Sequence, residues 1–170
     1  CYKIASPSLT DDDLLRHIRS MGRPVILSTG MSDMSMVRHA VSILGTDNLV
    51  LMQCTSAYPK VSAAGADPLA YVNLRVIDTY RREFGIPVGL SSHLNGIMPS
   101  YAAVAMGASV IEHHITLQKS DWGSDQAFSL EPNEITNLVR MIRELHVAKG
   151  DGAKSISSAE EEAMKKLRRK

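Results

Sequence analysis

Short apolar runs alternate along the chain with amphipathic segments, and this alternation limits the possible folds more than any other feature. The apolar runs are CYKIAS, RPVILSTG, NLVLMQCTS, IPVGLSS and ASVIEHHIT. The segments between them carry apolar residues at helical spacing, as in residues 69–80 and 135–145. Nearly continuous apolar strands separated by helices are typical of a parallel sheet that helices cover. We therefore predict an α/β fold.

Polar residues stand at the C-terminal ends of several of these runs: Ser6, Ser28, Thr55, Ser91, His93 and His114. A (β/α)8 barrel has this distribution, because its active site is assembled from strand ends and the loops that follow them. A complete barrel needs eight strands, and the sequence offers five candidates. We predict either a partial TIM (β/α)8 barrel or an open sheet. No GxGxxG motif follows the first run, which argues against a Rossmann dinucleotide site.

Composition excludes several classes of partner. The 170 residues are about the length of one domain, and 44% of them are hydrophobic. Lys and Arg number 19 against 18 for Asp and Glu, so we expect neither nucleic acid nor a membrane surface as partner. Two cysteines make no disulfide framework, and no apolar run approaches the roughly 20 residues that span a bilayer. We expect a cytoplasmic protein.

Strand geometry divides the ionisable residues of the run VIEHHIT between two faces. Glu112 and His114 share one face, and His113 lies on the other with Ile111 and Ile115. The outer face of a barrel meets the helices and is apolar, so we expect Glu112 and His114 to point into the barrel mouth. His113 is then a structural residue beneath the helices.

The same parity puts His93 on the inner face of the preceding strand. Two imidazoles at adjacent strand ends can share one divalent metal ion. A single buried histidine is more often a hydrogen-bonded core residue, but the pairing of His93 with His114, beside Glu112, favours a metal site. The other histidines lie on predicted helices, as surface or packing residues: His17, His39 and His146.

Hydroxyl groups and a lysine form a second group of candidates. Ser6, Ser28 and Ser91 could surround an anion together with Lys3, because hydroxyls and a cation bind phosphate oxygens. Serine at a strand end is also ordinary turn chemistry. Lys3 is more informative, since an unpaired charge within a short apolar strand is costly.

Three further residues have open interpretations. Asp125 lies in a glycine-containing loop after His114 and can either fold back over the mouth or only shape the loop. Tyr58 can meet a substrate hydroxyl, or it can owe its place to the extended backbone preferred before proline. Trp122, in the same loop as Asp125, is either a lid residue or an anchor for that loop.

The chain resembles the sialic acid synthases, which condense phosphoenolpyruvate with an N-acyl sugar. The resemblance extends to about Ala148 and rests on ordered motifs: YKIAS, GRPVILSTGM, QCTSAYP, NLRVI, PVGLSSH, AVAMGASVIEHHITL and GSDQAFSLEP. The family includes N-acetylneuraminate synthases and relatives that make legionaminic or pseudaminic acids, some of them called spore-coat polysaccharide enzymes. Its members have a TIM barrel followed by a small antifreeze-like domain.

The resemblance implies roles for particular residues. It implies that His93 and His114 hold a divalent metal, Mn²⁺ or Mg²⁺. It implies a phosphoenolpyruvate site made of Lys3, Ser6, Ser28, Ser56 and Ser91. It also implies catalytic or sugar-contacting roles for Glu112, beside the metal, and for Tyr58 and Asp125.

Three residues depart from the family pattern. Ser56 stands where some members have asparagine, and Ser92 replaces an aspartate or glycine before the metal histidine. Ser8 stands where some members carry a glutamate near the sugar. The last departure leaves open which sugar is used and which group activates water.

The resemblance also implies a domain organisation. Residues 1–150 correspond to the last five βα units of the barrel, from its fourth to its eighth strand, with two open sheet edges. Residues 151–170 form a charged linker or helix toward an antifreeze-like domain. The chain begins without an initiator methionine, so we expect a piece of a longer homodimeric protein, inactive by itself.

Two alternatives stay open. The first is a non-catalytic barrel fragment that serves as a binding or assembly module. The second is another TIM-barrel enzyme: a Schiff-base aldolase, for which Lys3 is the strand lysine, or a metallohydrolase. Two histidines are fewer ligands than a metallohydrolase usually has.

Overall fold

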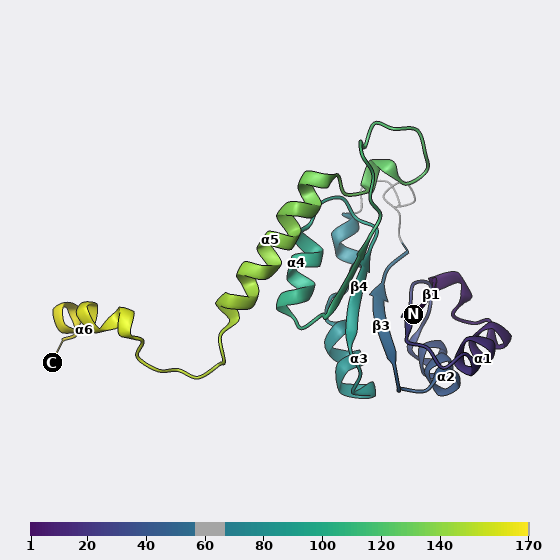
Figure 1. Cartoon of the computed structure of the whole chain (residues 1–170), viewed down its shortest axis with the longest axis horizontal. Helices are drawn as coiled ribbons and strands as arrows, with labels where there is room; N and C mark the ends of the chain where they lie inside the picture. Colours follow the sequence, from purple (N-terminus) through teal and green to yellow (C-terminus); the bar gives the residue numbers. More distant parts are fainter. Residues whose placement is uncertain (57–66, 170) are drawn as a thin grey trace.

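A parallel sheet forms the centre of the molecule (Figure 1). The structure is a computed structural model that describes residues 1–56 and 67–169, and these residues form five strands in chain order. Each strand pairs in parallel with the next. The strands are β1 (Tyr2–Ile4), β2 (Val25–Ser28), β3 (Leu49–Cys54), β4 (Val88–Ser92) and β5 (Val110–His113). The predicted α/β fold, part of a (β/α)8 barrel, is confirmed.

Most of the helices follow the strands and pack on one face of the sheet, and the last one does not (Figure 1). They are α1 (Asp12–Ser20), α2 (Met34–Leu44), α3 (Val76–Phe84), α4 (Met98–Ala105), α5 (Pro132–Lys149) and α6 (Glu161–Leu167). Short 3-10 helices are η1 (Ser6–Ser8), η2 (Pro68–Tyr71), η3 (Gln126–Phe128) and η4 (Ser158–Glu160). Figure 1 shows α6 standing apart from the sheet at the end of an extended segment. In the described part of the chain, no helix has the length and apolar character needed to cross a membrane.

Carboxylate caps fix where several helices begin. The Asp33 side chain accepts a hydrogen bond from the Met36 N–H at the start of α2, at 2.9 Å. The cap of α1 is Asp11, whose side chain accepts a hydrogen bond from the Leu14 N–H at 3.0 Å, although Thr10 beside it is also a residue type that caps helices. The helix expected across residues 69–80 is broken, because Asn73 adopts a left-handed φ of 46° between η2 and α3.

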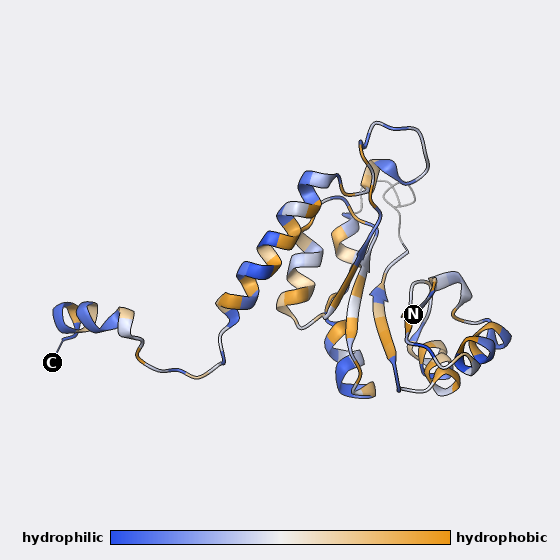
Figure 2. Ribbon diagram, viewed as in Figure 1, coloured by the Kyte–Doolittle hydropathy of each residue, from blue (hydrophilic) through white to orange (hydrophobic). Residues whose placement is uncertain are grey.

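The outer face of the sheet, against the helices, carries the apolar core. The strand residues that are at most 2% exposed include Ile4, Leu27, Leu51, Val88 and Leu90. They pack against helix residues such as Leu15, Val37 and Ile77. Figure 2 shows β3 apolar along its body and hydrophilic at its C-terminal tip. Burial therefore supports the sheet from the outside, and polar groups concentrate at the strand ends.

The inner face of the sheet is closely packed below the C-terminal ends of the strands. Met52 is fully buried there, opposite Gly89 in the register. A Cβ on Gly89 would lie 2.3 Å from the Val110 carbonyl oxygen and 2.5 Å from Met52 Sδ. Glycine therefore makes room for the Met52 side chain beneath the strand ends.

The fifth strand is shorter than the sequence suggested. It ends at His113, because its partner β4 ends at Ser92, and Ile115 is 70% exposed instead of lying beneath helices. Beyond the strand, the Leu130 N–H donates to the His114 carbonyl at 2.8 Å, and Ile115 forms a separate parallel bridge with Leu130. The loop after β5 thus leaves the sheet early and returns to it at Leu130.

Candidate functional site

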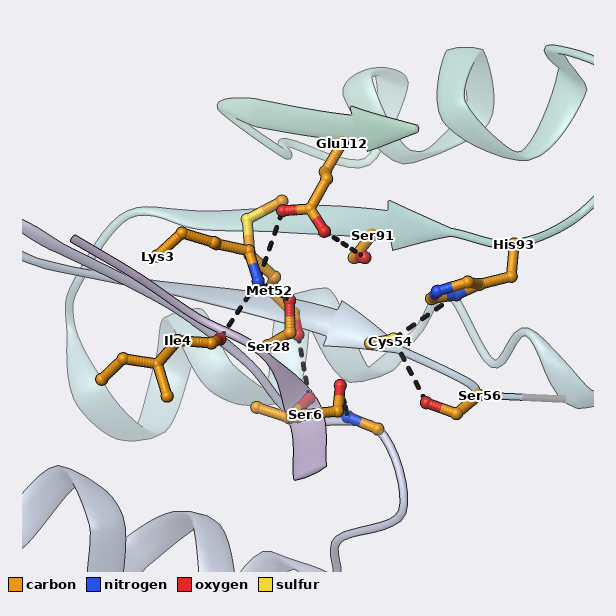
Figure 3. Close-up of polar contacts among 12 residues, drawn as sticks. Lys3, Ile4, Ser6, Ser28, Met52, Cys54, Ser56, Ser91, His93 and Glu112 are labelled. Carbon is orange, nitrogen blue, oxygen red and sulfur yellow. Dashed lines mark hydrogen bonds and ion pairs between the residues drawn. The ribbon is translucent and has the colours of Figure 1, made fainter. Parts of the chain in front are cut away.

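An open cleft of about 510 Å³ lies at the C-terminal ends of the strands. Its lining contains all the predicted anion-binding residues and both predicted metal ligands: Lys3, Ser6, Ser28, Ser56, Ser91, His93, Glu112 and His114. Ala5, Pro7 and Met31 complete the lining. Residues that are far apart in the sequence therefore meet at one end of the sheet (Figure 3).

Lys3 and Glu112 form the centre of a polar network across four strands (Figure 3). Lys3 Nζ donates to Ser28 Oγ at 2.9 Å and to the Ile4 carbonyl at 3.1 Å. It also lies 3.4 Å from Glu112 Oε2, whose other oxygen accepts from Ser91 Oγ at 2.9 Å. Lys3 is thus a paired charge, and Glu112 is held from two sides.

A close approach of backbone brings two more hydroxyls into the cleft. The Gly30 N–H donates to Ser6 Oγ at 2.9 Å. A Cβ on Gly30 would lie 2.2 Å from Ser56 Oγ and 2.8 Å from Ser6 Oγ. The glycine of the STG turn is therefore what allows Ser6 and Ser56 to lie side by side.

The two inner histidines face one another. The ring centroids of His93 and His114 are 5.2 Å apart, with 54° between the planes. Burial lowers the pKa of His93, although the charges of Glu112 and Asp125 act in the opposite direction. The neutral imidazole that binds metal is therefore the form favoured at neutral pH.

The loop after β5 supports His114 from its other side. Asp125 Oδ2 lies 3.6 Å from His114 Nδ1, and the Phe128 ring stands edge-on to the imidazole with 5.8 Å between ring centroids. The loop thus folds back over the mouth, which was one of the two interpretations of Asp125. A carboxylate that hydrogen-bonds a histidine nitrogen orients the ring, and Asp125 lies near enough to do so after a small shift.

Cys54 is a site residue that the sequence analysis did not single out. Its buried Sγ lies 3.7 Å from His93 Nδ1 and 3.8 Å from Ser56 Oγ. The parity signal that selected the other residues also applies to it, since Cys54 shares a strand face with Met52 and stands opposite Ser91.

The described side chains supply only some of the ligands that a divalent ion needs. Among residues 1–56 and 67–169, no group of three or more His, Cys, Asp or Glu side chains is arranged to hold a metal. His93 and His114 supply two nitrogen donors on one cleft wall, so water or substrate oxygens would fill the remaining positions.

The remaining histidines lie outside the cleft. His113 is on the outer face, where Nε2 lies 2.6 Å from Ser100 Oγ, and burial lowers its pKa to about 4. The other three are exposed on helices: His17, His39 and His146. Tyr58 lies outside the described residues.

Known proteins share both the sequence and the fold. A model of the NeuB family matches residues 1–154. N,N'-diacetyllegionaminic acid synthase of Campylobacter jejuni is 36% identical over 99% of this chain and 50% of its own length. Human N-acetylneuraminate-9-phosphate synthase is 39% identical over 98% of this chain and 45% of its own. The chain spans about half the length of the curated relatives it matches.

Solved structures agree with this comparison. The N-acetylneuraminic acid (sialic acid) synthetase of Leptospira borgpetersenii, crystallised with citrate, superposes with a TM-score of 0.82 and 33% identity. The match covers 99% of this chain and 58% of that one. A truncated 3-deoxy-D-arabino-heptulosonate 7-phosphate synthase from Thermotoga maritima, at 20% identity and a TM-score of 0.72, shares the fold.

Proposed function

The chain belongs to the NeuB family, and we propose that it carries a major part of an active site for making nonulosonic acids. The reaction is the condensation of phosphoenolpyruvate with an N-acyl amino sugar, such as N-acetylmannosamine, which releases phosphate. The relatives named above as legionaminic and sialic acid synthases support this proposal. The observation that carries it is the meeting of Lys3, four serine hydroxyls and two imidazoles in one cleft.

Phosphoenolpyruvate binds at the Lys3 side of the cleft. Its phosphate and carboxylate oxygens accept charge-assisted hydrogen bonds from the Lys3 ammonium and further bonds from Ser28 and Ser91. Ser6 and Ser56 extend the row of hydroxyls along the cleft wall. Lys3 already pairs with Glu112 at 3.4 Å, so the anion joins or replaces a partner that the lysine has in the free protein.

His93 and His114, whose ring centroids are 5.2 Å apart, would hold a divalent cation, Mn²⁺ or Mg²⁺. When bound, such an ion supplies Lewis-acid polarisation of the sugar's aldehyde oxygen. The chain keeps the His93 imidazole in its neutral form by burial and holds the His114 ring between Asp125 and Phe128.

The sugar lies toward Asp125 and His114, and Asp125 contacts its polar groups, a role that the family resemblance also implies for Tyr58. C3 of phosphoenolpyruvate attacks the aldehyde carbon, and positive charge develops at C2. The Glu112 carboxylate, fixed by Lys3 and Ser91, stabilises that charge. Water then adds at C2, and phosphate leaves by cleavage of its C–O bond. The cleft's main contribution is to orient two bound substrates.

A transplant tests this function. Residues 1–154 replace the corresponding part of the Leptospira synthetase, and phosphate release is measured with phosphoenolpyruvate and a series of N-acyl sugars. We expect release with at least one sugar, and its loss in the Lys3→Met variant of the transplant. A folded transplant that binds phosphoenolpyruvate but releases no phosphate with any N-acyl sugar would contradict a synthase and favour a non-catalytic binding module.

A further inference from the structure

The loop between β5 and α5 presents an indole ring to solvent. Trp122 is 97% exposed, and Leu117 in the same loop is 80% exposed. Trp122 is also the only tryptophan of the chain. A fully exposed indole forgoes most of the stabilisation that burying an aromatic ring provides, so its position calls for a ligand-dependent explanation.

The base of this loop is firmly attached to the sheet and to α5. The Thr116 N–H donates to the Leu130 carbonyl at 3.0 Å, next to the Leu130–His114 bond already described. Lys119 Nζ lies 2.7 Å from Glu134, and the Lys119 N–H donates to Glu131 at 2.8 Å. Movement is therefore confined to the part of the loop beyond Lys119.

The second limb of the loop returns to the cleft. Asp125 faces His114, and its carbonyl accepts a hydrogen bond from Ser129 Oγ at 2.8 Å. Trp122 precedes Asp125 by three residues, which span at most about 11 Å when fully extended. Gly123, with a φ of 155°, forms the turn between them. The indole is therefore tethered within reach of any ligand that lies beside Asp125.

We propose that residues 120–125 form a flap, and that Trp122 at its tip packs on the amino sugar bound beside His114 and Asp125. This inference rests on the proposed function. The sugar is the ligand concerned, because the flap rises from β5 on the His114 side, whereas Lys3 and its hydroxyl partner Ser28 belong to β1 and β2. Packing the indole on C–H groups and the acyl methyl buries apolar surface and excludes water from the reacting carbon.

A non-reacting sugar tests the flap in the chain itself. N-acetylmannosaminitol has no aldehyde carbon and therefore cannot condense. It is added with phosphoenolpyruvate and Mg²⁺, while calorimetry records binding and fluorescence records Trp122. We expect the emission to shift to shorter wavelength and acrylamide quenching to fall by about half when the alditol binds, since closure shields the ring. Phosphoenolpyruvate alone leaves both signals unchanged.

Each other outcome overturns the proposal in a distinguishable way. Unchanged emission with the alditol bound, or an alditol that fails to bind beside bound phosphoenolpyruvate, removes the flap and leaves the synthase function standing. Failure of phosphoenolpyruvate itself to bind removes the proposed function and the flap's ligand together. A shift that grows with protein concentration in the absence of ligand shows that a second copy covers Trp122.

Variants of Trp122 distinguish a direct contact between the indole and the sugar from an effect of the substitution on folding. Trp122→Ala is expected to weaken alditol binding about tenfold, the scale of one buried aromatic contact, with phosphoenolpyruvate affinity unchanged. Trp122→Phe retains most of the affinity. Val147→Ala, which removes another exposed apolar side chain on α5 (81% exposed), is the matched control and changes neither affinity. Equal alditol affinity in Trp122→Ala and the parent chain overturns the proposal.

Discussion

His113 and His114 are neighbours in the sequence, yet they belong to opposite faces of the sheet. His114 opens into the cleft, facing His93, with Asp125 at 3.6 Å. His113 is packed on the helix side against Ser100, and its Nδ1 has no hydrogen-bond partner among the described residues. One residue type therefore serves as a candidate ligand on one face and as a neutral packing group on the other.

The two faces of the whole sheet repeat this difference. The outer face is stabilised by apolar burial, as at Leu51 and Leu90. The inner face at the strand ends is connected by polar side chains, with Lys3 and Glu112 between strands. Changes on the inner face should therefore alter ligand binding, and changes on the outer face should alter stability.

Metal binding should show the largest effect. His93→Ala and His114→Ala are each expected to weaken Mn²⁺ binding at least about 100-fold, since even outer partners of a metal ligand are worth 10–100-fold. His113→Gln should leave Mn²⁺ affinity almost unchanged. Calorimetric titration of the folded variants checks this. Comparable losses in His113→Gln and His114→Ala would erase the distinction between the faces.

Removal of the positive charge of Lys3 should have the second-largest effect. Lys3→Met is expected to lower phosphoenolpyruvate affinity by about 10–100-fold, because hydrogen bonds to charged groups are worth roughly 1.5–3 kcal/mol. Lys154→Met, on the exposed C-terminal segment, is the control and should bind like the parent chain. Titration with phosphoenolpyruvate at fixed salt measures both, and equal affinities in the two variants would exclude Lys3 from the anion site.

The outer histidine should make stability depend on pH. The pKa of His113 is about 4 in the folded chain, below its ordinary value of 6.5, so the unfolded chain binds a proton that the folded chain does not. The free energy of unfolding should therefore fall as the pH drops from 6.5 to 4, by about 2 kcal/mol once partial exposure is allowed for.

Denaturant unfolding at several pH values measures this dependence. The carboxylates whose pKa is lowered in the folded chain, such as Glu134, contribute in the same direction only as the pH approaches their ordinary value of 4.5. His93, whose pKa is also lowered, contributes in the same direction. His113→Gln should therefore flatten the profile in part, whereas His146→Gln, an exposed control, should not. A profile unaffected by His113→Gln would refute the assignment.

The smallest expected effects are those of two serine substitutions, one on each face of the sheet. Ser100→Ala on the outer face should cost about 1–3 kcal/mol of unfolding free energy, because His113 Nε2 loses its partner in a buried place. Ser91→Ala should cost less than about 1 kcal/mol, because water in the open cleft can replace its bond to Glu112. The unfolding midpoints of both variants check this, and a larger cost for Ser91→Ala would reverse the account.

Strand periodicity predicted much of the site, because side chains alternate between the two faces of a strand whatever residues they contact. It assigned Glu112 and His114 to the cleft and His113 to the helix side, and it placed Ser91 and His93 together. Lys3 stood out because a charge in an apolar strand requires a partner. The same alternation also applies to Cys54, which was overlooked because a small apolar thiol raises no question of burial.

Other features depended on contacts that local sequence does not encode. The end of β5 is set by the length of β4 and by the return of Leu130, so Ile115 lies exposed instead of packed. The break at Asn73 interrupts a segment whose apolar spacing suits a continuous helix. The distances that hold Glu112 between Lys3 and Ser91 arise from the strand register across the sheet.

The most direct test of the central claim is the position of Mn²⁺ in crystals of this chain, found by anomalous scattering. We predict one strong peak between the rings of His93 and His114, about 2 Å from a nitrogen of each, at a ligand distance usual for imidazole. A peak at another site, or none at saturating Mn²⁺, would contradict the assignment of the inner face as the metal-binding face.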